Sequence, residues 1–136
     1  MAVTTGPRAI VEDFYWRFNS GERIPEAFFH PEMDWHWPQA TLGARVFHGH
    51  EGIHRGLSMW TESWGTFQME PEEFIEDGDD LFVRVRYRLR GAGSGIDIEH
   101  PVAHLVRVED GLIRSWWMFG NPDKARRHFL AADRPR

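Results

Sequence analysis

His104 is the residue of this chain with the clearest capacity for acid–base chemistry. It lies in the segment EHPVAHLVRVEDGLIRSWWMF, residues 99–119, where two apolar runs flank Asp110-Gly111. That dipeptide is typical of a two-residue hairpin turn, and with such a turn His104 faces Trp117. Because side chains alternate along strands, one face of the hairpin then holds His104, Val106, Ile113, Ser115, Trp117 and Phe119.

An imidazole on such an apolar face has a lowered pKa if it is buried, because burial disfavours the charged form. The neutral ring can then accept a proton near pH 7, as a general base must. The alternative is a core histidine that binds a backbone carbonyl or a carboxylate. The pattern alone leaves both interpretations open.

A second histidine pattern, HEGIH from His50 to His54, matches the H-E-x-x-H arrangement in which two histidines on a helix bind zinc. Gly52 is unfavourable in the middle of a ligand-bearing helix, and the pair falls at the start of the expected helix. A third ligand is not evident, although three glutamates lie downstream in residues 70–73. The sequence favours a loop-to-helix entry here, and we predict neither a metal nor a cofactor.

The elements that position these residues follow from the hydrophobic pattern, with helices first. One helix is expected from Pro7 to the sequence NSG at 19–21, with Ile10, Phe14 and Phe18 at helical spacing. A short helix is expected from Pro25 to the residue before Pro31, then a strand over 33–37 and a loop over 38–50. A third helix ends near Gly65 and has an apolar stripe: Ile53, Leu57, Trp60 and Trp64.

The second half of the chain has the period of strands, over 66–77, 80–90, 96–108 and 112–120. A tail helix follows over 121–130, with Asn121 as its cap and Pro122 in its first turn. Helices followed by a meander of strands predict an α+β fold with one curved antiparallel sheet. We expect a single domain of residues 1–136.

The hairpin formed by 81–90 and 96–104 decides which side chains face the core. The sequence GAGSG at 91–95 is flexible, so the pairing can slip by one residue and exchange the two faces. Burial of four guanidinium groups without partners costs too much free energy. We therefore expect Val83, Val85, Tyr87 and Leu89 to point inward and Arg84, Arg86, Arg88 and Arg90 to point outward.

The composition excludes several classes of partner. Of 136 residues 41% are hydrophobic, and the 7 Trp and 10 Phe are enough to pack a core or to line an apolar pocket. A net charge of -5 argues against nucleic acid. The chain has no cysteine, no apolar run of membrane-spanning length and no pattern of a signal peptide. We expect a soluble, cytoplasmic protein that does not bind a membrane.

Four segments together point to a known superfamily: VEDFYWRFNSGE, FFHPEMDWHWP, FHGHEGI and HLVRVEDGLIRSWW. In this order and spacing they resemble the nuclear transport factor 2-like superfamily, in particular its SnoaL-like and ketosteroid-isomerase-like members. The resemblance covers roughly residues 8–130. It implies a cone, in which a curved sheet wraps around about three N-terminal helices and encloses a deep apolar pocket.

The resemblance also implies roles for individual positions. The position that matches His104 holds an aspartate in the isomerases and SnoaL-type cyclases, where it acts as an acid or stabilises an oxyanion. The position of the isomerase base matches Trp37, which cannot accept a proton. The helix-one tyrosine matches Phe14, although Tyr15 is adjacent. His104 is therefore the expected acid or base, assisted by Tyr15 or His100.

Aromatic side chains are the expected substrate-binding residues of this pocket. By alternation, Trp35 and Trp37 point inward, whereas Asp34 and His36 lie on the other side or at the rim. The full set of expected substrate-binding residues is Phe14, Trp35, Trp37, Trp60, Trp117 and Phe119. For each of them the alternative is plain packing in the core.

Three functions remain open from the sequence. The first is a cofactor-independent proton transfer, such as isomerisation, cyclisation or dehydration, on a hydrophobic cyclic or polyketide-like molecule. The second is binding of an apolar ligand without catalysis. The third is epoxide hydrolysis, for which Arg86 matches the arginine of an Asp–Arg–Asp arrangement, whereas Arg88 and His104 stand where carboxylates belong.

The outer face of the predicted sheet suggests a partner. Trp116, Met118 and Leu105 would lie there beside the arginine rows, and such a face is too apolar to remain in water. We therefore expect a homodimer through the outer sheet face, which the resemblance also implies.

Overall fold

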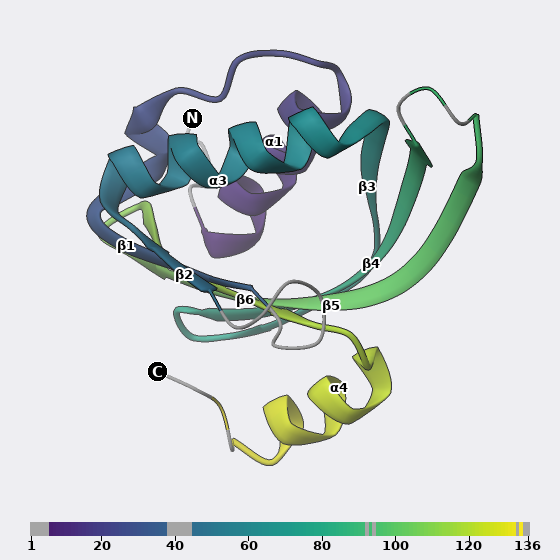
Figure 1. The fold of residues 1–136 in the computed structure, drawn as a ribbon. Coiled ribbons are helices and arrows are strands. Elements are labelled where there is room, and N and C mark those ends of the chain that lie inside the picture. Colours follow the sequence, from purple (N-terminus) through teal and green to yellow (C-terminus); the bar gives the residue numbers. More distant parts are fainter. Residues whose placement is uncertain (1–5, 38–44, 92, 94, 133, 135–136) are drawn as a thin grey trace.

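A curved sheet with helices on both of its faces forms the structure (Figure 1). This computed structural model describes residues 6–37, 45–91, 93, 95–132 and 134, apart from the side chains of 60, 61, 63 and 64. In chain order the elements are α1 (Pro7–Asn19), the 3-10 helix η1 (Glu26–Phe28), β1 (Phe29–Trp37), β2 (Arg45–His48), α3 (Gly49–Ser63), β3 (Trp64–Asp77), β4 (Asp80–Gly91), β5 (Asp97–Glu109), β6 (Leu112–Phe119) and α4 (Pro122–Leu130). None of the described helices is long and apolar enough to span a membrane.

The predicted fold class is confirmed, with one difference inside the sheet. In the described residues the strand order is β2-β1-β6-β5-β4-β3. Neighbouring strands are antiparallel except β1 and β6, which pair in parallel. A parallel pair needs a long crossover between its strands, and here the whole segment from β2 to β5 forms it. No local pattern in the sequence predicts such a pairing.

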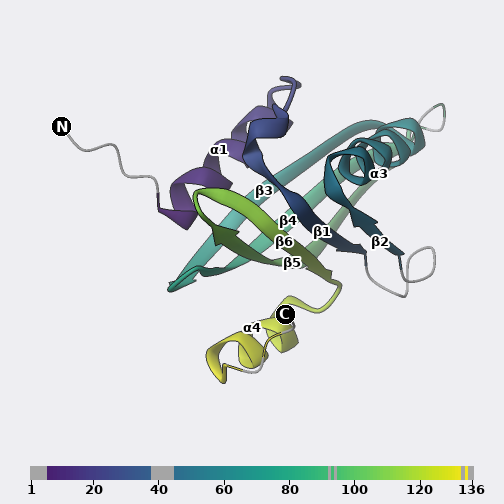
Figure 2. The same cartoon turned by 90° about the vertical axis from the view of Figure 1, so that its left-hand side faces the viewer.

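The helices α1 and α3 both lie on the concave face of the sheet (Figure 2). Pro7 opens α1, which buries Val11, Phe14 and Tyr15 against the sheet. Helix α3 lies over β1 and β2, where Gly52 and Gly56 bring its backbone close to the strands. A side chain at Gly56 would overlap Trp35, because its Cβ would lie 2.6 Å from the indole ring.

The first strands differ from the expected pattern. The second helix is a single 3-10 turn, and β1 already starts at Phe29 rather than at residue 33. β1 buries alternate residues, Met33, Trp35 and Trp37, and leaves Asp34 and His36 on the other side, as predicted. The predicted loop 38–50 contains β2 and the start of α3, and its residues 38–44 lie outside the described residues.

The register of the closing hairpin was predicted wrongly beyond its turn. Asp110 and Gly111 form the turn with positive φ angles, and Val108 pairs with Ile113 as expected. A β-bulge then leaves Arg114 without a partner on β5, so that Leu105 pairs with Trp117 and His104 with Met118. One extra residue exchanges the two faces of everything that follows it.

The exchange decides which aromatic side chains enter the cone. Trp116 and Met118 are buried in the interior core, whereas Trp117 and Phe119 pack on the outer face of the sheet. The hairpin of β4 and β5 follows the predicted faces, with Val83, Val85, Tyr87 and Leu89 in the interior core. Its arginines point outward.

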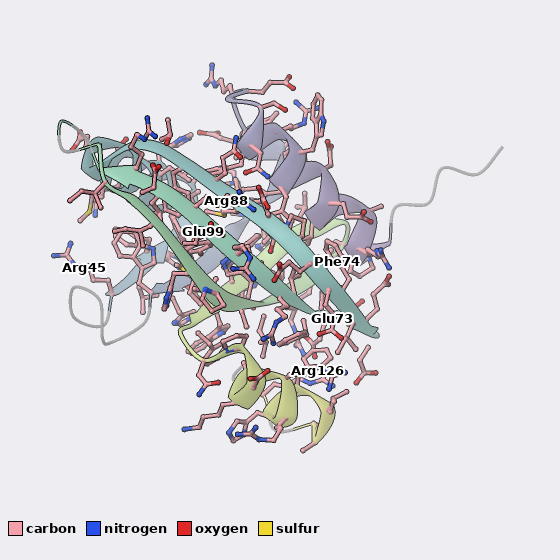
Figure 3. All side chains as sticks on the ribbon, turned by 90° about the vertical axis from the view of Figure 1, so that its right-hand side faces the viewer. Arg45, Glu73, Phe74, Arg88, Glu99 and Arg126 are labelled. Carbon is pink, nitrogen blue, oxygen red and sulfur yellow. The ribbon has the colours of Figure 1, made fainter. Side chains whose placement is uncertain are left out.

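Helix α4 and a ladder of ion pairs cover much of the outer face. Phe129 and Ala125 of α4 bury Phe82, Ala103 and Leu105 in a second, smaller core. Farther along, Arg88 and Glu99 belong to the ladder of charged side chains between β3, β4 and β5, and Glu73 of β3 bonds Arg126 of α4 (Figure 3).

This arrangement changes the argument for a homodimer. Of the residues expected at its interface, Trp116 and Met118 lie in the interior, and Leu105 is buried beneath α4. The outward arginines Arg86 and Arg88 already have carboxylate partners. The apolar residues that predicted this interface therefore do not form it. A homodimer through the outer sheet face stays a prediction of the resemblance alone, and it excludes a ligand on the part of that face that it covers.

Candidate functional site

A small apolar cavity lies between the helices and the sheet. Its volume is about 20 Å³, roughly the space that one water molecule needs. The lining residues come from α1 and α3 and from β1, β3, β4 and β6: Phe14, Phe29, Met33, Trp35, Ile53, Leu57, Met69, Tyr87, Trp116 and Met118. Tyr87 carries the one hydroxyl among these described lining residues, and none of them is charged.

His104 stands behind this cavity, bound on both ring nitrogens. Its Nδ1 lies 2.7 Å from the hydroxyl of Tyr15 on α1, and its Nε2 lies 2.5 Å from the hydroxyl of Tyr87 on β4. The imidazole is 0% exposed. Trp116 covers it, with ring centroids 4.9 Å apart, and His104 is absent from the described lining of the cavity.

The hydrogen bonds select one tautomer of His104. Among the described residues, Nδ1 is the one hydrogen-bond partner of the Tyr15 hydroxyl. If Nδ1 carried the proton, the Tyr15 hydroxyl proton would have no acceptor in a buried site, which costs about 1–3 kcal/mol. We therefore assign the proton to Nε2. Tyr15 donates to Nδ1, and Nε2–H donates to the Tyr87 oxygen.

Burial keeps all three groups neutral. It lowers the pKa of His104 to about 3, because the charged imidazolium loses its hydration. Burial likewise raises the pKa of both tyrosines, and for Tyr15 the neighbouring Tyr87 raises it further. At neutral pH the network therefore offers hydroxyl donors and an uncharged imidazole, and His104 in this closed state does not take up a proton.

The structure brings some of the expected site residues together and separates others. Tyr15 contacts His104, and Phe14 and Trp35 line the cavity. Trp37 packs against Trp35 and Phe47 in the core, outside the lining. His100 pairs with Tyr87 in the sheet register, but its side chain is exposed at the far end of β5 and has no described contact with the network.

Two expected substrate-binding residues lie on the wrong side of the sheet. Trp117 and Phe119 pack under α4, because the bulge at Arg114 turns them outward. The residues that replace them in the cavity are Trp116 and Met118. The side chain of Trp60 lies outside the part of the chain that the structure describes.

Tyr87 is the cavity residue and partner of His104 that the sequence did not predict. It was placed correctly on the inward face, but its contact with His104 requires the register in which Val83 pairs with His104. The available signal was a tyrosine on an inward face, since a buried tyrosine hydroxyl usually finds a partner. The cavity's methionines, Met33, Met69 and Met118, carried no signal beyond their hydrophobicity.

The residues of the two competing patterns have ordinary polar partners within the fold. In HEGIH, Nε2 of His54 is hydrogen-bonded to the Glu26 carboxylate at 2.8 Å, and Nε2 of His50 is hydrogen-bonded to the Phe29 carbonyl oxygen at 2.9 Å. The described residues contain no group of three or more side chains suited to a metal ion. Arg86 pairs with Glu72 on the outer face, so the arginine that epoxide hydrolysis requires is not in the cavity.

The fold and the cavity define the class of protein. A curved sheet around α1 and α3, with an apolar space between them, is the nuclear transport factor 2-like architecture, as the resemblance implied. The family model of the SnoaL-like domain matches residues 11–116. The chain therefore belongs to the SnoaL-like family. A search of the curated proteins finds no significant match.

Several solved structures share this fold. The structure of TerC co-crystallised with polyporic acid is similar at a TM-score of 0.73 and 20% identity, over 89% of this chain and 95% of that one. A nuclear transport factor 2-like protein of unknown function from Burkholderia pseudomallei has a TM-score of 0.75 and 19% identity, over 92% and 97%. A candidate polyketide cyclase from Sinorhizobium meliloti has a TM-score of 0.65 and 20% identity, over 81% of this chain and 93% of that one. Such low identities establish the fold alone.

Proposed function

We propose that this protein binds an apolar cyclic or polyketide-like molecule in the interior cavity and catalyses a cofactor-independent proton transfer on it. The observation that carries the proposal is Tyr87: it is the one residue of the described apolar lining with a hydroxyl, and that hydroxyl is hydrogen-bonded to a buried imidazole. Polyporic acid in the TerC crystal and the candidate polyketide cyclase support this class of ligand.

Tyr87 is the group that meets the ligand, and His104 positions it. In the assigned tautomer Nε2–H donates to the Tyr87 oxygen, which strengthens the tyrosine as a hydrogen-bond donor. A hydroxyl aimed at a ligand oxygen stabilises the negative charge that develops there in enolisation. An apolar surrounding increases the strength of that interaction, because it excludes bulk water. Because the described lining holds no base, the proton that leaves the ligand carbon goes to a water molecule that enters with the ligand, and this water returns it to form the product.

A ligand of this class needs more room than the cavity now has. Three methionines line it, and the unbranched methionine side chain adapts its shape more easily than any other apolar side chain. We expect Met33, Met69 and Met118 to change rotamer when a ligand enters.

Binding without catalysis is the second candidate, and it has an observation in its favour. The described cavity lining has no carboxylate or other base, and the position of the isomerase base is occupied by Trp37. A cavity that holds a donor and no base is also what a carrier of an apolar ketone needs.

One experiment separates the two candidates. A panel of unsaturated cyclic ketones is titrated against tryptophan fluorescence, and product is followed by absorbance and mass spectrometry. Turnover that falls about 100-fold or more in Tyr87→Phe, with binding retained, supports catalysis, since the loss of one such donor costs about 10²–10³ in kcat. Unchanged turnover in Tyr87→Phe contradicts it. Saturable binding without any product supports the carrier.

A further inference from the structure

A second hollow lies on the opposite face of the sheet from the proposed site. It has a volume of about 570 Å³, within the usual range of small-molecule sites. It is formed by β5, β6 and α4, with Leu105, Trp117, Phe119, Lys124, His128 and Arg134 among its lining. We call it the outer groove. We propose that the outer groove binds a planar aromatic carboxylate.

Two aromatic rings of β6 form the floor of the outer groove. Trp117 and Phe119 belong to its described lining, lie 6.5 Å apart with planes 13° from parallel, and remain partly exposed. His36 of the neighbouring strand is not in that lining; it stacks on one face of Trp117, with centroids 3.6 Å apart and planes 5° from parallel, and so fixes the plane of the indole. The other face of Trp117 and the ring of Phe119 suit a planar ring that stacks on them.

The wall of the outer groove supplies a cation. Lys124 is the only lysine of the chain, it is exposed, and it has no ion pair among the described residues. His128 follows four residues later, on the same side of α4. By contrast, the guanidinium of Arg134 already donates hydrogen bonds to Asp80 and Asp77, so it is not free to bind a further anion.

The local charge is opposite to that of the whole molecule. The chain has 21 acidic residues and a net charge of -5, yet no carboxylate belongs to the described lining of the outer groove. A hydrocarbon ligand would leave Lys124 unused, and a small inorganic anion would leave the aromatic floor unused. A ligand with one aromatic plane and one carboxylate uses both.

The single lysine permits a site-specific test with 2-naphthoate as the probe. Reductive methylation with ¹³C-formaldehyde labels Lys124 and the terminal amine and keeps the positive charge. The Lys124 signal is identified by its loss in Lys124→Gln. We expect 2-naphthoate to shift that signal saturably, and the neutral 2-naphthamide to bind at least about threefold more weakly.

Two variants measure the contribution of the charge, with tryptophan fluorescence as the readout. Lys124→Gln weakens naphthoate binding at least about threefold, whereas Lys124→Arg keeps the affinity within about twofold. An unmoved Lys124 signal, or equal affinity in Lys124→Gln and the wild type, overturns the proposal. A dimer at micromolar concentration whose Lys124 signal depends on protein concentration also overturns it, because a second copy then occupies the outer groove.

This test is independent of the interior site. Tyr87→Phe changes a side chain on the other face of the sheet, so naphthoate binding in the outer groove is expected to survive it. Loss of naphthoate binding in Tyr87→Phe would place the probe in the interior cavity and contradict the outer site.

Discussion

His104 has both of its nitrogens committed to tyrosine hydroxyls that come from α1 and β4. The ring therefore joins three distant parts of the chain, and its neutral state is a condition of the folded structure. The interpretation as a satisfied core histidine and the interpretation as part of a reactive site are compatible. His104 is satisfied, and one partner that satisfies it, Tyr87, is the group that lines the cavity.

Lowering the pH should reduce the free energy of unfolding, because His104 is neutral and buried in the folded protein. The unfolded imidazole takes up a proton near its ordinary pKa of about 6.5, whereas the folded one does so only near a pKa of about 3. Within that window the unfolded state binds more protons, so the free energy of unfolding falls with pH by at most about 1.4 kcal/mol per pH unit. The loss begins as the pH drops below the unfolded pKa.

His104→Gln isolates this contribution, because glutamine offers a donor and an acceptor but does not titrate. Urea unfolding of both proteins is measured from about pH 7.5 down to about pH 4.5. The wild-type advantage in free energy of unfolding should shrink steadily as the pH falls. Two parallel curves would show that the pKa of His104 is the same in the folded and the unfolded protein, which would contradict its burial.

Helix α3 shows how glycine determines the position of an element. Gly52 and Gly56 lower the intrinsic stability of the helix. For this reason the sequence disfavoured a metal-binding helix at Gly52. In the structure both glycines are buried on the side of α3 that faces Trp35 and Phe47. The cost in helix propensity is offset by close packing on β1 and β2, and this packing sets the width of the cavity.

Gly56→Ala tests the close approach. Elsewhere in a helix this change stabilises by up to about 1 kcal/mol, but here the added Cβ would lie 2.6 Å from the indole of Trp35. We expect a net loss of about 1–3 kcal/mol in chemical denaturation, as for other overpacked sites. Gly120→Ala is the control for a methyl group added without crowding, because the Cβ added there meets nothing within 4 Å; Gly120 lies between β6 and α4, outside any helix. An equal effect at both positions would contradict the packing argument.

The whole molecule contains two apolar cores on opposite faces of one sheet. The larger core lies inside the cone, and the smaller one joins α4 to the outer face through Phe129, which is 1% exposed and packs on Phe82. Because the sheet separates these cores, α4 is expected to detach without opening the interior. The same separation keeps the interior cavity and the outer groove apart.

Phe129→Ala tests this separation. Truncation of a buried phenylalanine costs about 3–5 kcal/mol, and we expect the cost to appear as faster hydrogen exchange in α4 and in the strands beneath it. Exchange in α1 and the fluorescence of the interior tryptophans should stay close to the wild type. Leu130→Ala is the control, since Leu130 is 56% exposed. Equal acceleration of exchange in α1 and α4 would mean that the two cores unfold as one.

The amino-acid sequence was enough to predict the α+β class, most of the helices and strands, the inward face of β4 and the family, because these depend on local period and on the order of segments. Three features could be seen only in the folded molecule: the parallel pair of β1 and β6, the bulge at Arg114 and the contact of His104 with Tyr87. Each of these depends on residues far apart in the chain. The bulge matters most, because strand alternation has a period of two, and a single unpaired residue moved Trp117 out of the cone and Trp116 into it.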